Sequence, residues 1–433
     1  MKVVKIILFN EVETLKANFS CEPVGQGLFY KGKIEDSIVV YDCGSNNKEK
    51  LEECIDQLET TINKEERIHV LMISHFHEDH INGIEILLSK FKVDNVVIPY
   101  IDNIERALLL AKKGYGKTQS TLDILIDPVR YFLHPSRRVK RIIFIAPGKG
   151  VPSPDNPEDF YNDNNEDEVF NIRDMEEDKE LIEELSNDTF YKTQINNGKL
   201  FILQHDKYAV LNNTWKFKFF NLKVVSNVLR KFEIEIKSIL NFQDKEILNE
   251  QLKNKSIRKQ ISECYAECFN KRGTKFNDTS LVVYHGPIKT SNMHITSCVE
   301  GCATLVTNEP CFFYPIFHNH ESEHLFTGQL LCGDISLSKR DNYFEWQRHY
   351  TKELNDITFM LLPHHGSIHN WNSDIIKDCK NLNLFMASSA FSNKYGHPSL
   401  ELINILRLHN KMFINGNEFV GTEIKINSAK YFL

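Results

Sequence analysis

Four residues that can bind divalent metal ions crowd into six positions of this chain. His75, His77, Asp79 and His80 follow the apolar run IHVLMIS, residues 68–74. Alternation in an extended turn would send His75 and His77 to one side, whereas Asp79 and His80 would reach a second point where a helix begins. Imidazole and carboxylate ligands suit zinc, or manganese or iron where carboxylates dominate. Lone surface histidines are common, but four such residues after a buried strand favour two adjacent cation sites.

This spacing resembles the His-x-His-x-Asp-His signature of the metallo-β-lactamase-fold family, and further landmarks of that family follow in order. They are Asp42 in VVYDCGS, Asp334 in LLCGDIS, His364 and His365 in PHHGS, and His397 in YGHP, together with VGQG at residues 24–27 and NDTSLVV at residues 277–283. The set resembles the branch typified by the ComEC-type DNA-uptake nuclease domain and its stand-alone soluble relatives. The resemblance covers residues of about 20 to 100 and 275 to 410.

The resemblance implies a site with two divalent metal ions, zinc in the first place and manganese as the alternative. His75, His77, Asp79 and His80 would be ligands, and Asp334 would bridge both ions. Asp42 would orient the metal-binding loop through a hydrogen bond. Of His364 and His365, one would bind the second ion and the other would touch substrate or a nearby carboxylate, and the sequence leaves the choice open.

Hydrolysis is the chemistry that such a site supports. A hydroxide held between two cations about 3.5–4 Å apart has its pKa pulled toward neutrality, and the metals neutralise charge on the attacking and leaving oxygens. His397, set between Gly396 and Pro398, would donate to a phosphate oxygen or to the leaving group. Ser367 would add a hydroxyl donor. We therefore take Asp79, Asp42 and His397 as candidate catalytic residues.

One position departs from the family pattern. Most members supply a third histidine to the first metal, and the matching place here holds Asn277 and Asp278. ComEC-type relatives also lack that histidine, which implies a weaker or manganese-tolerant first site, and we take Asn277 as a candidate substrate contact. His285 and His294 could substitute as ligands, although isolated histidines at a strand end and in a loop favour an ordinary structural role.

A second cluster of cysteines and histidines is more loosely spaced. It comprises Cys298, Cys302, Cys311, His318, His320 and His324, with Cys332 close to Asp334. Zinc ribbons usually show pairs two residues apart, which are absent here, so buried thiols and surface histidines are favoured over a structural zinc.

The elements that position the predicted site are short apolar strands that end in polar residues, as α/β sheets require at their ligand-binding edge. Strand-like runs lie at residues 37–41, 68–74, 93–99, 280–284, 325–331, 357–362 and 384–388. Residues 81–91 have the apolar spacing of a helix. Residues 226–241 and 245–270 predict two long helices. MKVVKIILFN at the start suits a first strand better than a signal peptide.

Charge is unevenly distributed along the chain. The 433 residues include 52 basic and 59 acidic side chains, a net charge of −7, yet residues 155–184 hold 14 acidic and two basic ones. Outside that segment the balance is +5, so a polyanionic substrate is not excluded. Residues 152–175 predict a mobile loop, because their polar composition cannot offset ordering entropy. The basic run at residues 137–141 is either solvated or a polyanion contact.

Together these patterns predict an α/β fold, a four-layer αββα metallo-β-lactamase sandwich split by a long, largely helical insertion. Residues 1–103 and 276–433 would form its two halves, and residues 104–275 the insertion. The leading function is a metal-dependent phosphodiesterase or nuclease acting on nucleic acid or a nucleotide. Hydrolysis of small esters, lactones or thioesters, and a non-catalytic metal-stabilised partner, are the alternatives. We expect a cytoplasmic protein, because the chain has no apolar run long enough to span a membrane and its cysteines are few for its length. The insertion is a candidate surface for docking a protein partner.

Overall fold

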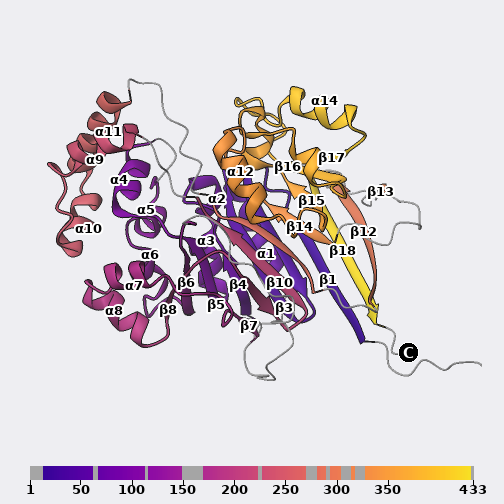
Figure 1. The fold of residues 1–433 in the computed structure, drawn as a ribbon, viewed down its shortest axis with the longest axis horizontal. Helices are drawn as coiled ribbons and strands as arrows, with labels where there is room; N and C mark the ends of the chain where they lie inside the picture. The colour runs from indigo at the N-terminus through magenta and orange to yellow at the C-terminus, as the bar shows by residue number, and fades with distance from the viewer. Residues whose placement is uncertain are drawn as a thin grey trace, which may run out of the picture.

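Two β-sheets lie face to face at the centre of the protein, and helices cover the outer side of each (Figure 1). The computed structural model describes residues 13–61, 67–112, 116–148, 169–222, 227–269, 280–288, 293–303, 314–316 and 327–430. The predicted α/β sandwich, with its helix, sheet, sheet, helix layers, is thereby confirmed. The expected strand at residues 1–10 lies outside the described residues.

The first sheet contains ten strands within the described part of the chain. In spatial order they are β13 (Tyr314–Ile316), β12 (Met293–Ala303), β18 (Val420–Lys430), β1 (Glu13–Cys21), β2 (Gly27–Ile34), β3 (Ser37–Ser45), β4 (Arg67–Met72), β5 (Lys92–Pro99), β6 (Val139–Ile145) and β8 (Leu200–Leu203). The run from β3 to β8 is parallel, and the other pairs are antiparallel.

The second sheet has eight strands among the described residues. Their order is β17 (Met412–Gly416), β16 (Leu384–Ser388), β15 (Ile357–Leu361), β14 (Gly328–Leu331), β11 (Val282–Pro287), β10 (Trp215–Phe220), β9 (Tyr208–Leu211) and β7 (Phe170–Asn171). Strands β14 to β17 are parallel. Both sheets therefore present the carboxyl ends of parallel strands, where α/β folds place their ligands.

Alternating side chains along the strands build three apolar layers. In β4, Val70 and Met72 enter the core between the sheets, whereas Leu71 faces the helices on the outer side. In β15, Phe359 likewise points between the sheets. This period of two explains why the buried strands are apolar on both faces.

Helices on the outer side of the first sheet come from the first two thirds of the chain. They are α1 (Lys48–Thr61), α2 (Glu78–Ile81), α3 (Ile84–Lys90), α4 (Asn103–Ala111), α5 (Gln119–Ile126), α6 (Pro128–Phe132), α7 (Lys179–Leu185), α8 (Thr189–Asn196), α9 (Asn227–Ile236), α10 (Lys245–Lys253) and α11 (Lys255–Cys268). The second sheet is accompanied by α12 (Arg340–His349), the 3-10 turns η2 (Pro363–Gly366) and η3 (Ile368–Asn370), α13 (Ile375–Asp378) and α14 (Leu400–Leu408). None of the described helices is long and apolar enough to cross a membrane.

The helix predicted over residues 245–270 is in fact two helices, α10 and α11. The side chain of Asn254 between them accepts hydrogen bonds from the backbone N–H groups of Ser256 and Ile257, which caps α11. An N-cap of this kind begins a new helix although the apolar spacing continues across it. The predicted helix at residues 81–91 is likewise divided between α2 and α3.

The stretch predicted as an insertion, residues 104–275, contributes strands to both sheets. Strands β6 and β8 extend the first sheet, and β7, β9 and β10 extend the second. Residues 152–168 of the predicted mobile loop lie outside the described residues. The end of that loop is packed instead, because Phe170, Ile172 and Met175 are buried in the core between the sheets.

Part of the basic run at residues 137–141 also has a structural role. Arg141 is buried and donates hydrogen bonds to the side chain of Asn95 and to the carbonyl of Phe170. The guanidinium of Arg137 lies 3.6 Å from the centre of the Tyr131 ring. These contacts leave Arg141 unsuited to bind a polyanion.

Candidate metal centre

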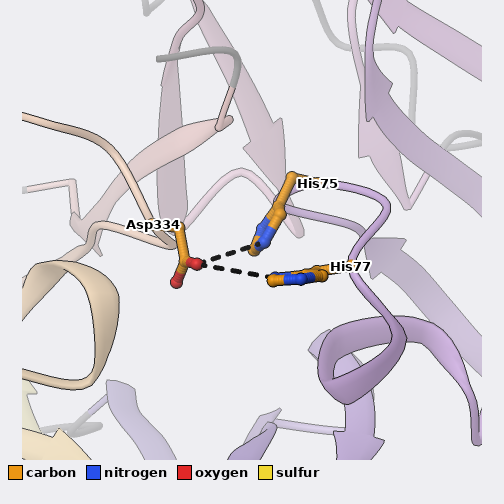
Figure 2. Close-up of side chains that lie close together, drawn as sticks. All are labelled: His75, His77 and Asp334. Atoms are coloured by element: carbon orange, nitrogen blue, oxygen red, sulfur yellow. Dashed lines mark ion pairs between the residues drawn. The ribbon is translucent and has the colours of Figure 1, made fainter. Parts of the chain in front are cut away.

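The predicted ligands converge at the carboxyl ends of parallel strands from both sheets. His75, His77, Asp79 and His80 follow β4 and run into α2. From the second sheet, Asp334 follows β14, the histidine pair of η2 follows β15, and His397 follows β16. Figure 2 shows Asp334 approaching His75 and His77 from the opposite side.

A glycine allows the Asp334 loop to lie against the histidine loop. Gly333 has φ +53°, and a Cβ added to it would lie 2.8 Å from the Cβ of Ser74. Any larger residue would therefore be strained and would push Asp334 away from His75. The backbone N–H of Asp334 also donates to the hydroxyl of Ser280 at 3.0 Å.

The two carboxylate oxygens of Asp334 face different histidines. Its Oδ2 lies 3.4 Å from Nε2 of His75 and 4.0 Å from Nδ1 of His77, whereas its Oδ1 lies 3.5 Å from Nε2 of His80. On the far side of the site, Oδ2 of Asp79 lies 3.5 Å from Nε2 of His365. Asp334 therefore stands between two groups of side chains.

Those two groups each have the composition of a metal site. The first comprises His75, His77 and Asp334, and the second comprises Asp79, His80 and His365. Within each group the potential ligand atoms lie within 4.8 Å of one another. Both groups could hold a metal ion, and sequence reasoning had placed every member of them at the site.

Asp42 sets the orientation of His75 and His80. Its Oδ1 accepts the backbone N–H of Ser74 at 2.7 Å, and its Oδ2 accepts the Ser74 hydroxyl at 2.6 Å and Nδ1 of His80 at 2.8 Å. Because the Ser74 hydroxyl gives its proton to Asp42, its oxygen accepts Nδ1–H of His75 at 2.9 Å. Both imidazoles therefore carry their proton on Nδ1 and turn the other nitrogen, Nε2, toward Asp334.

His365 follows the same pattern. Its Nδ1 donates to the backbone carbonyl of Ser388 at 2.6 Å, which leaves Nε2 facing Asp79. His75 and His80 are almost fully buried, and their Nε2 atoms have no hydrogen-bond partner among the described residues. Buried nitrogen lone pairs aimed at a carboxylate fit divalent cations such as zinc.

Burial and charge separate the protonation behaviour of these histidines. Burial lowers the pKa of His75 to about 4, so this imidazole is neutral. Burial opposes the charged form of His80 as well, but Asp42 and Asp334 raise the pKa of His80 to about 9. A cation bound at Nε2 would take the place of that proton. The pKa of Asp334 lies well below its usual value, since burial is outweighed by neighbouring His364 and His75.

His364 and His365 have different environments. Both have a positive φ, 49° and 57°, which is uncommon for residues other than glycine and often marks functional sites. Nε2 of His364 lies 3.9 Å from Asp334, and its ring lies 5.5 Å from that of His397. Only His365 belongs to one of the two ligand groups, and burial lowers the pKa of His364.

The metal groups lie in a cleft of about 740 Å³, within the size range of small-ligand sites. Fourteen residues line it: Gln26, Asn46, His77, Glu78, Asp79, Lys112, Gly116, Lys117, Asp334, His364, His365, Lys394, Tyr395 and His397. Sequence reasoning missed the three lysines and Glu78. Glu78 lies within the motif and shows no distinctive spacing, and Lys112 and Lys117 reach the cleft only through the fold.

The remaining predicted site residues have varied positions. His397 lines the cleft, whereas Ser367 is buried and does not line the part of the cleft that the structure describes. Asn277, the side chain of His294 and the cysteine and histidine cluster at residues 298–324 lie outside the described side chains. Both ring nitrogens of His285 lie at hydrogen-bond distance from other side chains, Nδ1 from Trp215 and Nε2 from Tyr30.

Residues 28–167 match the model of the Metallo-beta-lactamase superfamily. This range contains Asp42 and the motif from His75 to His80, so the metallo-β-lactamase match includes four of the six residues in the two candidate ligand groups. No curated protein sequence matches the chain at a significant level.

Two solved structures are similar to this chain at low sequence identity. The metallo-beta-lactamase fold protein YhfI from Bacillus subtilis is 10% identical, with a TM-score of 0.32, over 94% of this chain and 99% of that one. Human tRNase Z, short form, is 9% identical, with a TM-score of 0.35, over 93% of this chain and 98% of that one.

Proposed function

We propose that this protein is a hydrolase that uses two divalent metal ions to cleave phosphodiester bonds in nucleic acid or a nucleotide. One observation carries the proposal: the two oxygens of Asp334 face two separate groups of oriented ligands. Since a single carboxylate can contact two cations, Asp334 would bridge them. Two bound ions would supply Lewis acidity and a water activated near neutral pH.

His75, His77 and Asp334 would hold one ion, and Asp79, His80 and His365 with Asp334 the other. The predominance of imidazole favours zinc, and the two carboxylates also allow manganese. Asp42 would keep His80 and, through Ser74, His75 in the tautomer that exposes Nε2. Of the two neighbouring histidines, we assign His365 to the metal and His364 to the substrate side.

His397 is our candidate for moving a proton to the leaving oxygen. It lines the cleft beside His364, and Oδ1 of Asn393 accepts its backbone N–H at 3.1 Å, which holds the loop. A histidine can protonate an alkoxide leaving group near neutral pH. His364 would contact a phosphate oxygen.

Phosphodiesters are favoured over neutral esters by the charge of the cleft. Lys112, Lys117 and Lys394 line it together with the metal groups. Cations at the rim attract phosphate, whereas a neutral ester would gain nothing from them. The resemblance of the motifs to the ComEC-type branch supports the same substrate class.

Two further proposals concern the setting of the protein. Seven cysteines in the described part of the chain are free thiols, and six of them are buried. Free thiols suit a reducing compartment such as the cytoplasm. We also keep residues 104–275 as an insertion that could dock a protein partner, with helices α7 to α11 as its more exposed part.

The proposal is tested by hydrolysis with a defined metal content. Protein loaded with zinc or manganese is assayed on bis(p-nitrophenyl) phosphate, dinucleotides, single- and double-stranded DNA and RNA, beside p-nitrophenyl acetate and a lactone. We expect phosphodiester cleavage that is lost in an Asp79→Ala, His80→Ala variant and retained in a His409→Ala control, since His409 is exposed on the surface. Full metal occupancy with cleavage of esters alone would contradict the proposed substrate.

A further inference from the structure

The rim of the metal cleft carries cations and an aromatic ring that the hydrolytic chemistry does not need. Lys117 comes from the connection between α4 and α5, and Lys394 and Tyr395 come from the connection between β16 and α14. Both lysines are exposed, and neither forms an ion pair with a residue that the structure describes. Tyr395 is 55% exposed.

The position of Lys117 depends on the metal-binding motif itself. Glu78 lies between His77 and Asp79 in the sequence, and its side chain is buried. Its carboxylate accepts hydrogen bonds from the backbone N–H groups of Lys117 and Thr118. It also accepts the hydroxyl of Thr121 at 2.6 Å. One buried carboxylate therefore ties this wall of the cleft to the ligand loop, so Lys117 keeps a fixed place relative to the metal groups.

The opposite connection is held by Asn393. Its Oδ1 accepts the backbone N–H of Tyr395 and of His397, each at 3.1 Å, and its Nδ2 donates to the carbonyl of Ala390. The ring of Tyr395 lies nearly parallel to that of His397, at 14° and 6.3 Å between centroids. Nζ of Lys394 lies 5.3 Å from the centre of the Tyr395 ring. A flat aromatic surface and a cation thus stand together beside a candidate proton donor.

We infer that Lys117, Lys394 and Tyr395 form a binding site for a single nucleic acid strand at the rim of the cleft, which works without bound metal. The lysines would contact backbone phosphates, and Tyr395 would stack on one base. A single strand exposes the faces of its bases for such stacking, whereas a duplex buries them. This inference rests on the proposed function and specifies its substrate.

Binding is measured first, because it does not depend on hydrolysis. A short fluorescein-labelled oligothymidylate is titrated with the full-length protein, without and with zinc, and followed by fluorescence anisotropy. We expect the Lys117→Ala, Lys394→Ala variant to bind at least about tenfold more weakly at low salt. Each phosphate contact to a single strand contributes about 0.7 to the slope of log K against log salt, so the slope should shrink by about 1.4. A Lys259→Ala, Lys380→Ala control removes two exposed lysines outside the cleft and should bind as the wild type does.

Stacking is tested separately. Tyr395→Ala should weaken binding by roughly fivefold or more, and Tyr395→Phe should restore it, since the ring and not the hydroxyl makes the contact. Unchanged affinity and salt slope in the lysine variant, or equal binding of a blunt duplex, would overturn the inference.

Hydrolysis assays then distinguish a failure of the rim site from a failure of the hydrolase proposal. If bis(p-nitrophenyl) phosphate is cleaved but the lysine variant keeps the wild-type preference for oligonucleotide, the rim site is wrong and the hydrolase proposal stands. If the strand binds through these residues but no phosphodiester is cleaved, the rim site stands and the hydrolase proposal is wrong. We expect both the rim site and the hydrolase proposal to hold. In the Lys117→Ala, Lys394→Ala variant, kcat/KM for the oligonucleotide should then fall at least tenfold relative to kcat/KM for bis(p-nitrophenyl) phosphate.

Discussion

Two largely buried groups of histidine and aspartate in this protein are alike in the distances between their ligand atoms and different in their hydrogen bonds and charge. His205, Asp206 and His349 bring potential ligand atoms within 4.8 Å of one another, as His75, His77 and Asp334 do. Distance alone would therefore predict a third metal site, between β8 and the end of α12. The hydrogen bonds that Nδ1 of each imidazole forms distinguish the two groups.

In the candidate metal centre, three histidines donate a hydrogen bond from Nδ1, the ring nitrogen that points away from the proposed metal ions. Nδ1 of His75, His80 and His365 gives a proton to a hydroxyl, a carboxylate and a carbonyl in turn, which leaves Nε2 free to bind a cation. At His205 the direction is reversed, because Nδ1 accepts the backbone N–H of Asn221 at 3.1 Å. The proton of His205 must then reside on Nε2, the nitrogen that faces Asp206.

Charge distinguishes the two groups as well. Asp42, Asp79 and Asp334 are buried around the metal centre and favour a cation there. Near His205 lies the cation Lys218, which pairs with buried Glu353 at 3.4 Å. The lesson is that the partners of a histidine, and not its neighbours alone, decide whether it can be a ligand.

The largest predicted effect is loss of metal and activity on breaking the metal centre. Asp79→Ala with His80→Ala removes two ligands of one group, so we expect one fewer bound ion per chain by elemental analysis. Hydrolysis should fall by more than the roughly hundredfold that outer partners of a ligand typically contribute. The matched variant, His205→Gln with His349→Gln, should keep its full metal content at pH 8. A lower metal content in that control would mean that the second group also binds a cation.

The next effect concerns the orienting carboxylate. Asp42→Asn keeps the size of the side chain but removes the charge that holds Nδ1–H of His80. We expect zinc affinity to fall about 10- to 100-fold, measured by competition with a chelator. An unchanged affinity would show that the loop keeps its ligands in place without Asp42.

Much of the candidate metal centre could be predicted because it depends on local spacing. The motif from His75 to His80 and the carboxylate Asp334 each follow an apolar strand, and such strand ends meet at one edge of a sheet. The different orientations of His364 and His365 could not be predicted, since they depend on a left-handed backbone and on the carbonyl of Ser388 in another strand.

Other contacts between distant parts of the chain carried no signal in the sequence. His205 and His349 lie 144 positions apart in sequence, and no motif connects them. Lys117 reaches the cleft because buried Glu78 binds its backbone, which no spacing rule describes. Strands β8 and β9 have four residues each, too short to be recognised as parts of the two sheets.

The pH dependence of stability tests whether the histidines of the second group are neutral in the folded protein. Burial, and after it the charge of Lys218, lowers the pKa of His205 to about 4, and burial lowers the pKa of His349 well below its usual value. Both rings are neutral in the folded protein, whereas the unfolded chain takes up their protons below about pH 6.5. The folded state is therefore most stable above that pH and loses stability as the pH falls toward 4, by up to ~1.4 kcal/mol per pH unit for each ring.

Chemical denaturation between pH 7 and pH 5 measures this slope. His205→Gln should reduce it, whereas His409→Gln on the surface should leave it as in the wild type. A slope that does not change in His205→Gln would mean that this ring is charged in the folded protein, unlike His75, whose pKa burial also lowers to about 4.

The smallest effect is expected at His285, which sequence reasoning had considered as a replacement ligand. Trp215 Nε1–H donates to Nδ1 of His285 at 3.2 Å, so the proton on Nε2 points to Tyr30, whose hydroxyl donates to Gln329 at 2.6 Å. This chain of hydrogen bonds leaves His285 no lone pair for a cation, as at His205. Trp215→Phe removes the first bond and should lower the free energy of unfolding by about 1–3 kcal/mol, the cost of an unpaired buried acceptor together with the lost ring volume. Metal content should stay at the wild-type value. A lower metal content in Trp215→Phe would instead place His285 with the oriented ligands of the metal centre.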